Sequence, residues 1–149
     1  MRSFLVSCVA SVILVASLRG ATIADEYGPK TNPPKVAWIA VYLDAKSGDP
    51  KLSDLRGFTP AATKVRVGDH IVFFNIDDEV HTATVRVAGA FPPNAMKPMG
   101  HRISEAWSTG DLKANGESSP ILADKIGHYT YGCVHHFAQG QQATIVVEP

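Results

Sequence analysis

The feature that most constrains the fold of this chain is a series of short segments whose side chains alternate between two faces. In residues 63–67, Thr63, Val65 and Val67 share one face and two cations share the other, which is the period of a half-buried strand. Further segments rich in β-branched and aromatic residues are 36–43, 70–75, 81–87, 103–108, 127–133 and 144–147. Turns containing glycine or proline separate these segments, and none has the period of an amphipathic helix of three turns. We therefore expect an all-β sandwich.

The composition excludes several other kinds of protein. The chain has 149 residues, enough for one domain, and its 14 Lys and Arg residues are balanced by 14 Asp and Glu residues. A protein that binds nucleic acid through phosphate contacts needs an excess of basic residues, so we expect no nucleic-acid partner. Two cysteines cannot build a disulfide-rich scaffold. The sequence contains neither the glycine-rich motifs of nucleotide-binding proteins nor the common serine hydrolase motif.

The N-terminal segment has the pattern of a secretory signal peptide. Arg2 provides a positive start, and the apolar stretch that follows is shorter than the roughly 20 residues of a membrane span. We predict a signal peptide at residues 1–24, cleaved after Gly20 or Ala24. The resulting protein is expected in the periplasm, without stable membrane association. The rival interpretations are an uncleaved anchor and a lipoprotein modified at Cys8, but Cys8 precedes most of the apolar stretch that a lipoprotein needs ahead of it.

The remaining chain divides into a short leader and one domain. Residues 25–35 hold one glycine and three prolines, which predicts an extended leader. Residues 36–149 contain all the strand-like segments and form the predicted domain. Without its signal peptide the chain keeps a single cysteine, Cys133. Because an unpaired thiol is a liability in an oxidising compartment unless something occupies it, Cys133 is the first candidate functional residue.

Three residues carry the metal chemistry that the sequence suggests. His81 begins one strand-like segment, Cys133 ends another, and His136 follows three residues later in a C-x-x-H pattern. A thiolate and an imidazole at this spacing can reach one metal ion when the turn between them is tight, and a histidine from a distant strand completes the set. Two histidines and a cysteine are the trigonal ligands of blue copper, usually with a weak axial ligand, whereas structural zinc normally has four strong ligands. We predict one copper ion that alternates between Cu(II) and Cu(I).

Two blocks of the sequence resemble the cupredoxins, the blue copper proteins of the plastocyanin and pseudoazurin type. One block contains a V-x-V-G-D turn and ends at His81, and the other contains the Y-x-Y-x-C-x-x-H pattern of residues 129–136. The resemblance covers residues 36–149. It implies a Greek-key β-sandwich of about seven to eight strands, in which His81, Cys133 and His136 are the equatorial copper ligands.

The axial position is the first departure from the family's pattern. The family commonly has a methionine five residues after the second histidine, and this position is Gln141. Glutamine is a known substitute axial ligand, and its harder amide oxygen should favour Cu(II) and lower the reduction potential. Gln139 is the competing candidate, and Gln141 is preferred because it leaves the alignment of the last strand without a gap.

Three more departures surround the motifs. Thr82 replaces an asparagine that is frequent in the family, and His135 replaces a frequent proline and is expected to be an exposed turn residue. The extra length between the two blocks falls in residues 88–120. Outside the motifs, Trp38 and Trp107 are both expected in the hydrophobic core.

The resemblance implies a carrier of single electrons rather than an enzyme. We expect a monomer whose redox partners, a cytochrome or a copper enzyme, dock near His136 beside an apolar patch formed by Val134 and Phe137. The acidic residues 77–79 are expected to form a solvated loop. The alternative is a copper-handling or storage protein, or a non-blue copper site with an open ligand position. The departures from the family's pattern at Gln141 and His135 support keeping this alternative.

Overall fold

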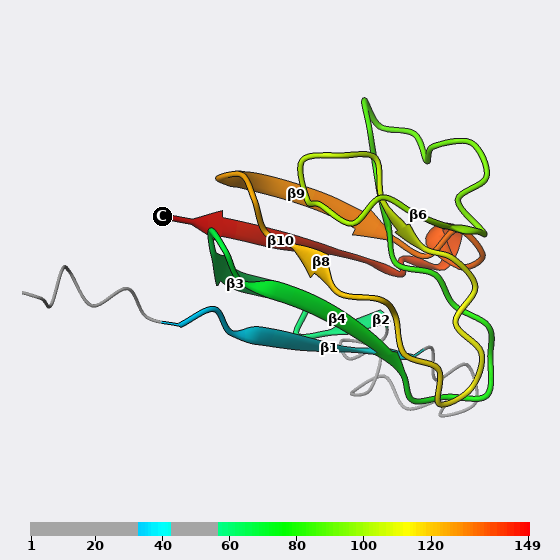
Figure 1. Cartoon of the computed structure of the whole chain (residues 1–149). Helices are drawn as coiled ribbons and strands as arrows, with labels where there is room; N and C mark the ends of the chain where they lie inside the picture. The colour runs from blue at the N-terminus through cyan, green and yellow to red at the C-terminus, as the bar shows by residue number, and fades with distance from the viewer. Residues whose placement is uncertain (1–32, 43–56) are drawn as a thin grey trace, which may run out of the picture. The chain divides into compact units, whose positions relative to one another are not determined.

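Two sheets packed face to face form the fold of residues 33–42 and 57–149, which are the residues described by this computed structural model (Figure 1). The predicted signal peptide and most of the predicted leader lie outside these residues. The strands are β1 (Val36–Tyr42), β2 (Gly57–Thr59), β3 (Ala62–Arg66), β4 (His70–Asn75), β5 (Thr84–Val85), β6 (Pro98–Met99), β7 (Ser108–Thr109), β8 (Ile121–Leu122), β9 (Gly127–Gly132) and β10 (Gln142–Glu148). The part of the chain described contains no α-helix, only the 3₁₀ turn η2 (Phe137–Gln139), and hence no helix long and apolar enough to cross a membrane.

The strand order confirms the predicted β-sandwich. One sheet has the order β2-β1-β4-β8 and the other the order β3-β10-β9-β5-β7-β6. Strands β3 and β4 follow one another in sequence but belong to different sheets. Strand β3 pairs in parallel with β10, the last strand, and β4 pairs in parallel with β1, the first. The chain therefore crosses repeatedly between the two layers, as a Greek-key sandwich requires.

The core between the sheets is built from the inward-facing half of each strand. At its centre four aromatic rings pack with centroids 4.6–6.2 Å apart, and these belong to Phe58, Phe73, Trp107 and Tyr131. A fully buried side chain of this kind contributes roughly 1.5–3 kcal/mol, whereas an exposed ion pair such as that of Lys64 with Glu148 contributes about 0–1 kcal/mol. The buried rings thus account for far more of the stability than the surface charges do.

The two tryptophans have different environments. Trp107 is fully buried, as expected, but Trp38 is 55% exposed, so its predicted place in the core is wrong. The reason is the alternation of β1, in which Ile39 and Val41 point inward and Trp38 points to the opposite face.

The segment 81–87 is a strand for only part of its predicted length, because β5 begins at Thr84. Upstream of β5, His81 forms a single bridge to Leu112 through both backbone groups. The N–H of Thr82 donates to the Sγ atom of Cys133 instead of to a strand carbonyl. Side chains of the candidate metal centre therefore interrupt the strand ladder at this point.

The predicted strand at residues 103–108 is also largely wrong. Only Ser108 belongs to a strand there, in β7, which pairs with the short strand β6.

Candidate metal centre

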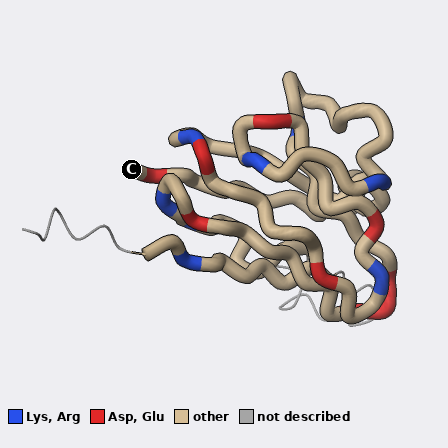
Figure 2. The backbone as a smooth tube through the Cα atoms, viewed as in Figure 1, with Lys and Arg blue, Asp and Glu red and all other residues tan. Residues whose placement is uncertain are grey.

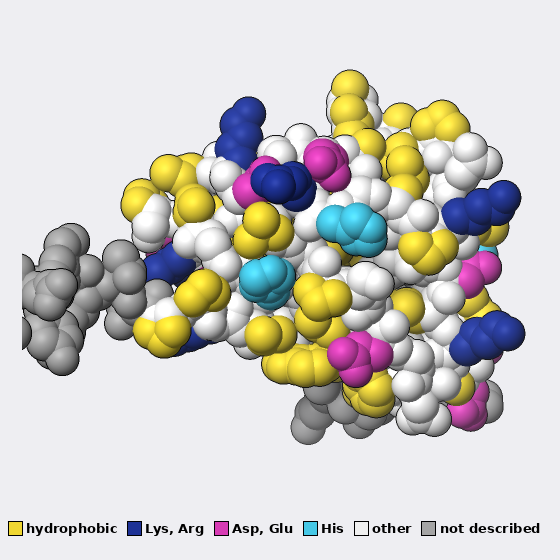
Figure 3. Space-filling view, in the orientation of Figure 1, with side chains coloured by type: hydrophobic (Ala, Val, Ile, Leu, Met, Phe, Trp, Pro, Cys, Tyr) yellow, Lys and Arg dark blue, Asp and Glu magenta, His cyan; other side chains and the backbone are white. Residues whose placement is uncertain are grey.

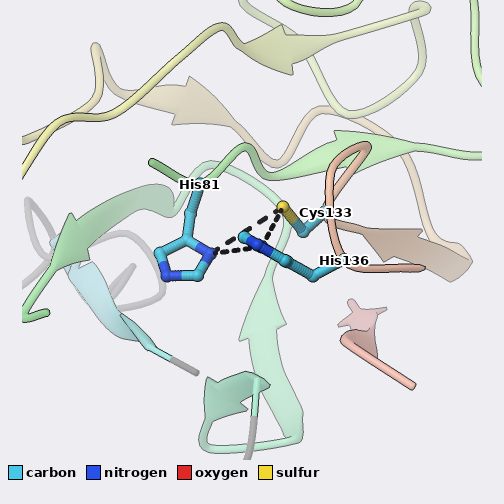
Figure 4. A group of neighbouring side chains, drawn as sticks. All are labelled: His81, Cys133 and His136. Atoms are coloured by element: carbon cyan, nitrogen blue, oxygen red, sulfur yellow. Dashed lines mark hydrogen bonds between the residues drawn. The ribbon is translucent and has the colours of Figure 1, made fainter. Parts of the chain in front are cut away.

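The predicted ligands come together at one end of the second sheet. His81 lies just before β5, Cys133 directly after β9, and His136 just before η2. Figure 4 shows the three side chains converging, with both imidazoles presenting Nδ1 towards the sulfur. Among the residues that the structure describes, they form a group of ligand atoms within 4.8 Å of one another. The side chains of His81 and Cys133 are fully buried, and that of His136 is partly exposed.

The three donor atoms are spaced as ligands of one metal ion. The two Nδ1 atoms are 3.1 Å apart, and the sulfur lies 3.5 Å from Nδ1 of His136 and 3.8 Å from Nδ1 of His81. Metal–nitrogen bonds of about 2.0–2.1 Å and metal–sulfur bonds of about 2.3 Å, at trigonal or tetrahedral angles, separate two donors by about 3.3–3.8 Å. The donors are therefore within a few tenths of an ångström of the spacing that a bound ion needs.

The turn between Cys133 and His136 is tight because a glycine precedes it. A Cβ atom on Gly132 would lie 2.7 Å from the ring of Phe137 and 2.8 Å from the carbonyl oxygen of Gln141. The N–H of Cys133 donates to the same Gln141 carbonyl, and the N–H of Gln141 donates to the carbonyl of His136. These contacts fold η2 back onto the end of β9, which brings the ligands of the C-x-x-H pattern to one side.

The electrostatics of the group favour the ligand form of the cysteine. Burial raises the pKa of the Cys133 thiol, but hydrogen bonds from His81 and from the amides of Thr82, His136 and His135 outweigh burial and lower it. Burial lowers the pKa of His81, and its hydrogen bonds with Cys133 and Asp77 more than reverse this effect. Metal-free, the site thus holds a proton more readily on His81 and less readily on the sulfur than free side chains would.

His136 behaves in the opposite way. Burial and the neighbouring charge of His81 lower the pKa of the His136 imidazole, which favours the neutral form that binds a metal ion.

Gln141 lies beside the three ligands, whereas Gln139 is exposed in η2. The Gln141 side chain is fully buried, and its Oε1 is 3.1 Å from Nδ1 of His81. Its Nε2 donates to the carbonyl oxygens of Tyr42 and Gly57, at 3.2 and 3.4 Å. Because these two acceptors bind the amide nitrogen, the amide oxygen is the atom turned towards the ligand group.

Asp77 is a site residue that the sequence analysis missed. Instead of lying in a solvated loop, it has both carboxylate oxygens 3.0 Å from Nε2 of His81, the ring nitrogen that faces away from the other ligands. The loop is fixed by Asn75, whose Oδ1 accepts the N–H of Asp77, while Asp77 Oδ1 accepts the N–H of Glu79. A carboxylate on the outer nitrogen of a ligand histidine fixes the ring orientation and raises its basicity.

His135 is exposed, as predicted, and is paired. Its Nε2 lies 2.8 Å from Oδ1 of Asp111, a residue of the extra segment between the two sequence blocks.

Comparison with known proteins identifies the family. The family model described as copper binding proteins, plastocyanin/azurin family, matches residues 45–148. The chain belongs to this family. It is a cupredoxin, and its histidine–cysteine–histidine group is consistent with one copper ion. No relative among the curated proteins matches the chain.

Solved structures of cupredoxins are similar in fold. The purple cupredoxin of Nitrosopumilus maritimus is 13% identical, with a TM-score of 0.53 over 75% of this chain and 99% of that one. Oxidised plastocyanin of Dryopteris crassirhizoma is 19% identical, with a TM-score of 0.51 over 75% and 100%. An amicyanin with Cu(I), in which a methionine is replaced by glutamine, is 18% identical, with a TM-score of 0.50 over 76% and 82%.

Removing the charge of Asp77 is expected to weaken copper binding. In Asp77→Asn the amide keeps an oxygen for the N–H of Glu79, but Nε2 of His81 loses its anionic partner. Loss of such a partner typically costs about 10–100-fold in metal affinity, and the reduction potential should rise because the carboxylate stabilises the more highly charged Cu(II). A competition titration and a redox titration measure the two effects.

The matched control for this variant is Asp78→Asn, which removes the same charge from the neighbouring, exposed residue. It should leave affinity and potential close to those of the parent protein. Equal shifts in both variants would mean that only net charge matters and that the contact with His81 has no specific role.

Proposed function

We propose that this cupredoxin carries single electrons between redox partners, with one copper ion held by His81, Cys133 and His136. The observation that carries the proposal is the spacing of the three donor atoms, 3.1–3.8 Å apart in a group of two buried side chains and one partly exposed side chain. Copper supplies the one-electron couple, Cu(II)/Cu(I). A protein that already holds its ligands in place changes little between the two states, so little reorganisation opposes each transfer.

We further propose Gln141 as the axial ligand. The two hydrogen bonds of its Nε2 atom turn Oε1 towards the ligand group, which supports this role over one for the exposed Gln139. A backbone-anchored amide oxygen is a harder donor than a thioether and favours Cu(II), so the reduction potential should be low for the family.

His136 is the proposed exit for the electron, because its side chain is the partly exposed one of the three. Beside it, the Phe137 ring packs edge-on against Phe91 at 5.3 Å, and the guanidinium of Arg86 lies 4.4 Å from its centre. The segment between β5 and β6 thus adds apolar surface next to the ligand turn, including Val87 and Met96, which are 53% and 54% exposed. Hydrophobic side chains gather over this segment at the upper right of Figure 3.

The proposed partner is a redox protein rather than a nucleic acid. Lysine and arginine are interspersed with aspartate and glutamate and form no basic stripe in the part of the chain that is coloured (Figure 2). A mixed surface of this kind suits a transient protein contact better than a polyphosphate.

The deciding experiment is the copper stoichiometry and the visible spectrum of the purified protein, followed by a redox titration. One copper per chain, an intense thiolate-to-copper band and fast, reversible reduction are expected. A weakly coloured protein that exchanges its copper readily would instead identify a copper-handling protein. Sequencing the N-terminus of the exported protein tests the proposed periplasmic location and the cleavage after Gly20 or Ala24.

A further inference from the structure

A row of buried hydroxyl groups leads away from the metal centre. The side chains of Thr82, Thr84 and Ser108 are 0%, 0% and 3% exposed. Oγ1 of Thr82 lies 3.2 Å from Oγ1 of Thr84, which lies 2.7 Å from Oγ of Ser108. The row ends on the carbonyl oxygen of Ala95, to which the Ser108 hydroxyl donates. It therefore joins β5, β7 and the segment before β6 through side-chain hydroxyls.

The near end of the row holds the turn that carries the sulfur ligand. The N–H of Val134, the residue after Cys133, donates to Oγ1 of Thr82 at 2.9 Å. The N–H of Thr82 donates in turn to Sγ of Cys133 at 3.4 Å. Thr82 thus contacts the ligand turn twice, once at the sulfur and once at the following amide.

The direction of the hydrogen bonds makes Thr82 the acceptor at this end. The hydroxyl of Thr84 donates to Oγ1 of Thr82, which also accepts the N–H of Val134. A hydroxyl oxygen has two lone pairs, so these two bonds use both of them. The bond from Thr84 fixes the rotation of the Thr82 side chain. Ser108 has a single hydroxyl proton for two acceptors, Oγ1 of Thr84 and the carbonyl oxygen of Ala95, and its hydrogen bond to Thr84 holds that side chain in turn. The Thr82 Oγ1 atom, which accepts the N–H of Val134, is therefore also held by a hydrogen bond from Thr84.

The far end of the row is anchored in a closely packed part of the fold. Oγ of Ser108 also accepts the N–H of Gly110 at 3.1 Å. A Cβ atom on Gly110 would lie 2.5 Å from the backbone nitrogen of Pro98, so the two segments have no space between them. The N–H of Asp111 donates to the carbonyl of Met96 across the same contact. The far end of the hydroxyl row is therefore attached to closely packed backbone segments.

We propose that Thr84 and Ser108 are positioning residues of the metal centre, which act through Thr82 to hold the Cys133 turn against residues 95–110. This gives the extra segment between the two sequence blocks a role in the site itself. The proposal does not depend on electron transfer, because it concerns how the protein holds the ligand turn with or without metal. It goes beyond the proposed function by adding two residues whose hydroxyls bond to other side chains and the backbone rather than to a ligand atom.

The test compares Thr84→Val and Ser108→Ala with a matched control, Thr63→Val. Thr63 is also a buried strand threonine, but its hydroxyl has no hydrogen-bond partner among the described residues. In the metal-free and Cu(I)-loaded protein, amide hydrogen exchange of Val134 should become about five- to tenfold faster in the first two variants, as expected for a weakened buried hydrogen bond. Release of copper to a chelator should become about tenfold faster or more. Thr63→Val should change neither rate.

Two further variants separate positioning from packing. Thr84→Ser keeps the hydroxyl and loses only a methyl group, so Val134 should remain protected. The double variant Thr84→Val with Ser108→Ala should be no worse at Val134 than Thr84→Val alone, because the row is already broken. If Thr84→Val does not fold, Ser108→Ala and Thr84→Ser still decide the matter. The proposal is overturned if the amide of Val134 in Thr84→Val and Ser108→Ala exchanges at the rate found in Thr63→Val. It is also overturned if the exchange rate of Val134 rises no more than the rates of all other amides.

These outcomes are distinct from failure of the proposed function. A parent protein without the intense copper band would refute the electron carrier, while exchange at Val134 in the metal-free chain would still report on the hydroxyl row.

Discussion

The Cys133→Ser variant is expected to lose the intense visible absorption of the copper protein completely. The sulfur lies 3.5 and 3.8 Å from the two ligand nitrogens, and hydrogen bonds lower the pKa of its thiol. A serine hydroxyl at the same place stays protonated and offers copper no thiolate, so the charge-transfer band has no donor. Copper affinity should fall by more than the roughly 10–100-fold typical for residues that only support a ligand.

Absorption and a competition titration measure these two losses, and near-ultraviolet circular dichroism checks that the variant folds. His128→Ala is the matched control, since His128 is an exposed histidine of β9 outside the ligand group. It should keep the band and the copper stoichiometry. A Cys133→Ser protein that retains both would refute the assignment of Cys133.

The clustering of the three candidate ligands was predictable because local spacing fixes most of their geometry. Cys133 and His136 are three residues apart, so a tight turn brings both side chains to the same side. His81 lies 52 residues upstream of the cysteine, and the resemblance of its sequence block to the cupredoxins identified it. The alternating segments likewise predicted the sandwich, because a period of two is the period of strands with one face buried and excludes helices.

The residues that support the ligands could not be predicted in this way. Asp77 is one of three acidic residues in a row, and only the folded loop places its carboxylate, rather than that of Asp78, against His81. Thr84 and Ser108 look like ordinary strand residues, since the row they form depends on pairing between β5 and β7. Trp38 was misplaced for a similar reason, because apolar character alone does not say which face of β1 is covered.

Gln141→Met tests the axial position, and the reduction potential should rise, because a thioether favours Cu(I) more than an amide oxygen does. The absorption spectrum should change with it. The variant also removes the Nε2 donor from the carbonyls of Tyr42 and Gly57. An unsatisfied buried acceptor costs about 1–3 kcal/mol, so the metal-free protein should unfold at a lower denaturant concentration.

The two effects in Gln141→Met have different origins and can be measured separately, by a redox titration of the copper protein and by urea unfolding of the metal-free protein. Gln139→Met is the control, since Gln139 is exposed in η2 and should change neither quantity. A loss of stability with an unchanged potential and spectrum would show that Gln141 only ties β10 to the β1–β2 edge. A raised potential together with lower stability means that one amide group serves the metal with its oxygen and the fold with its nitrogen.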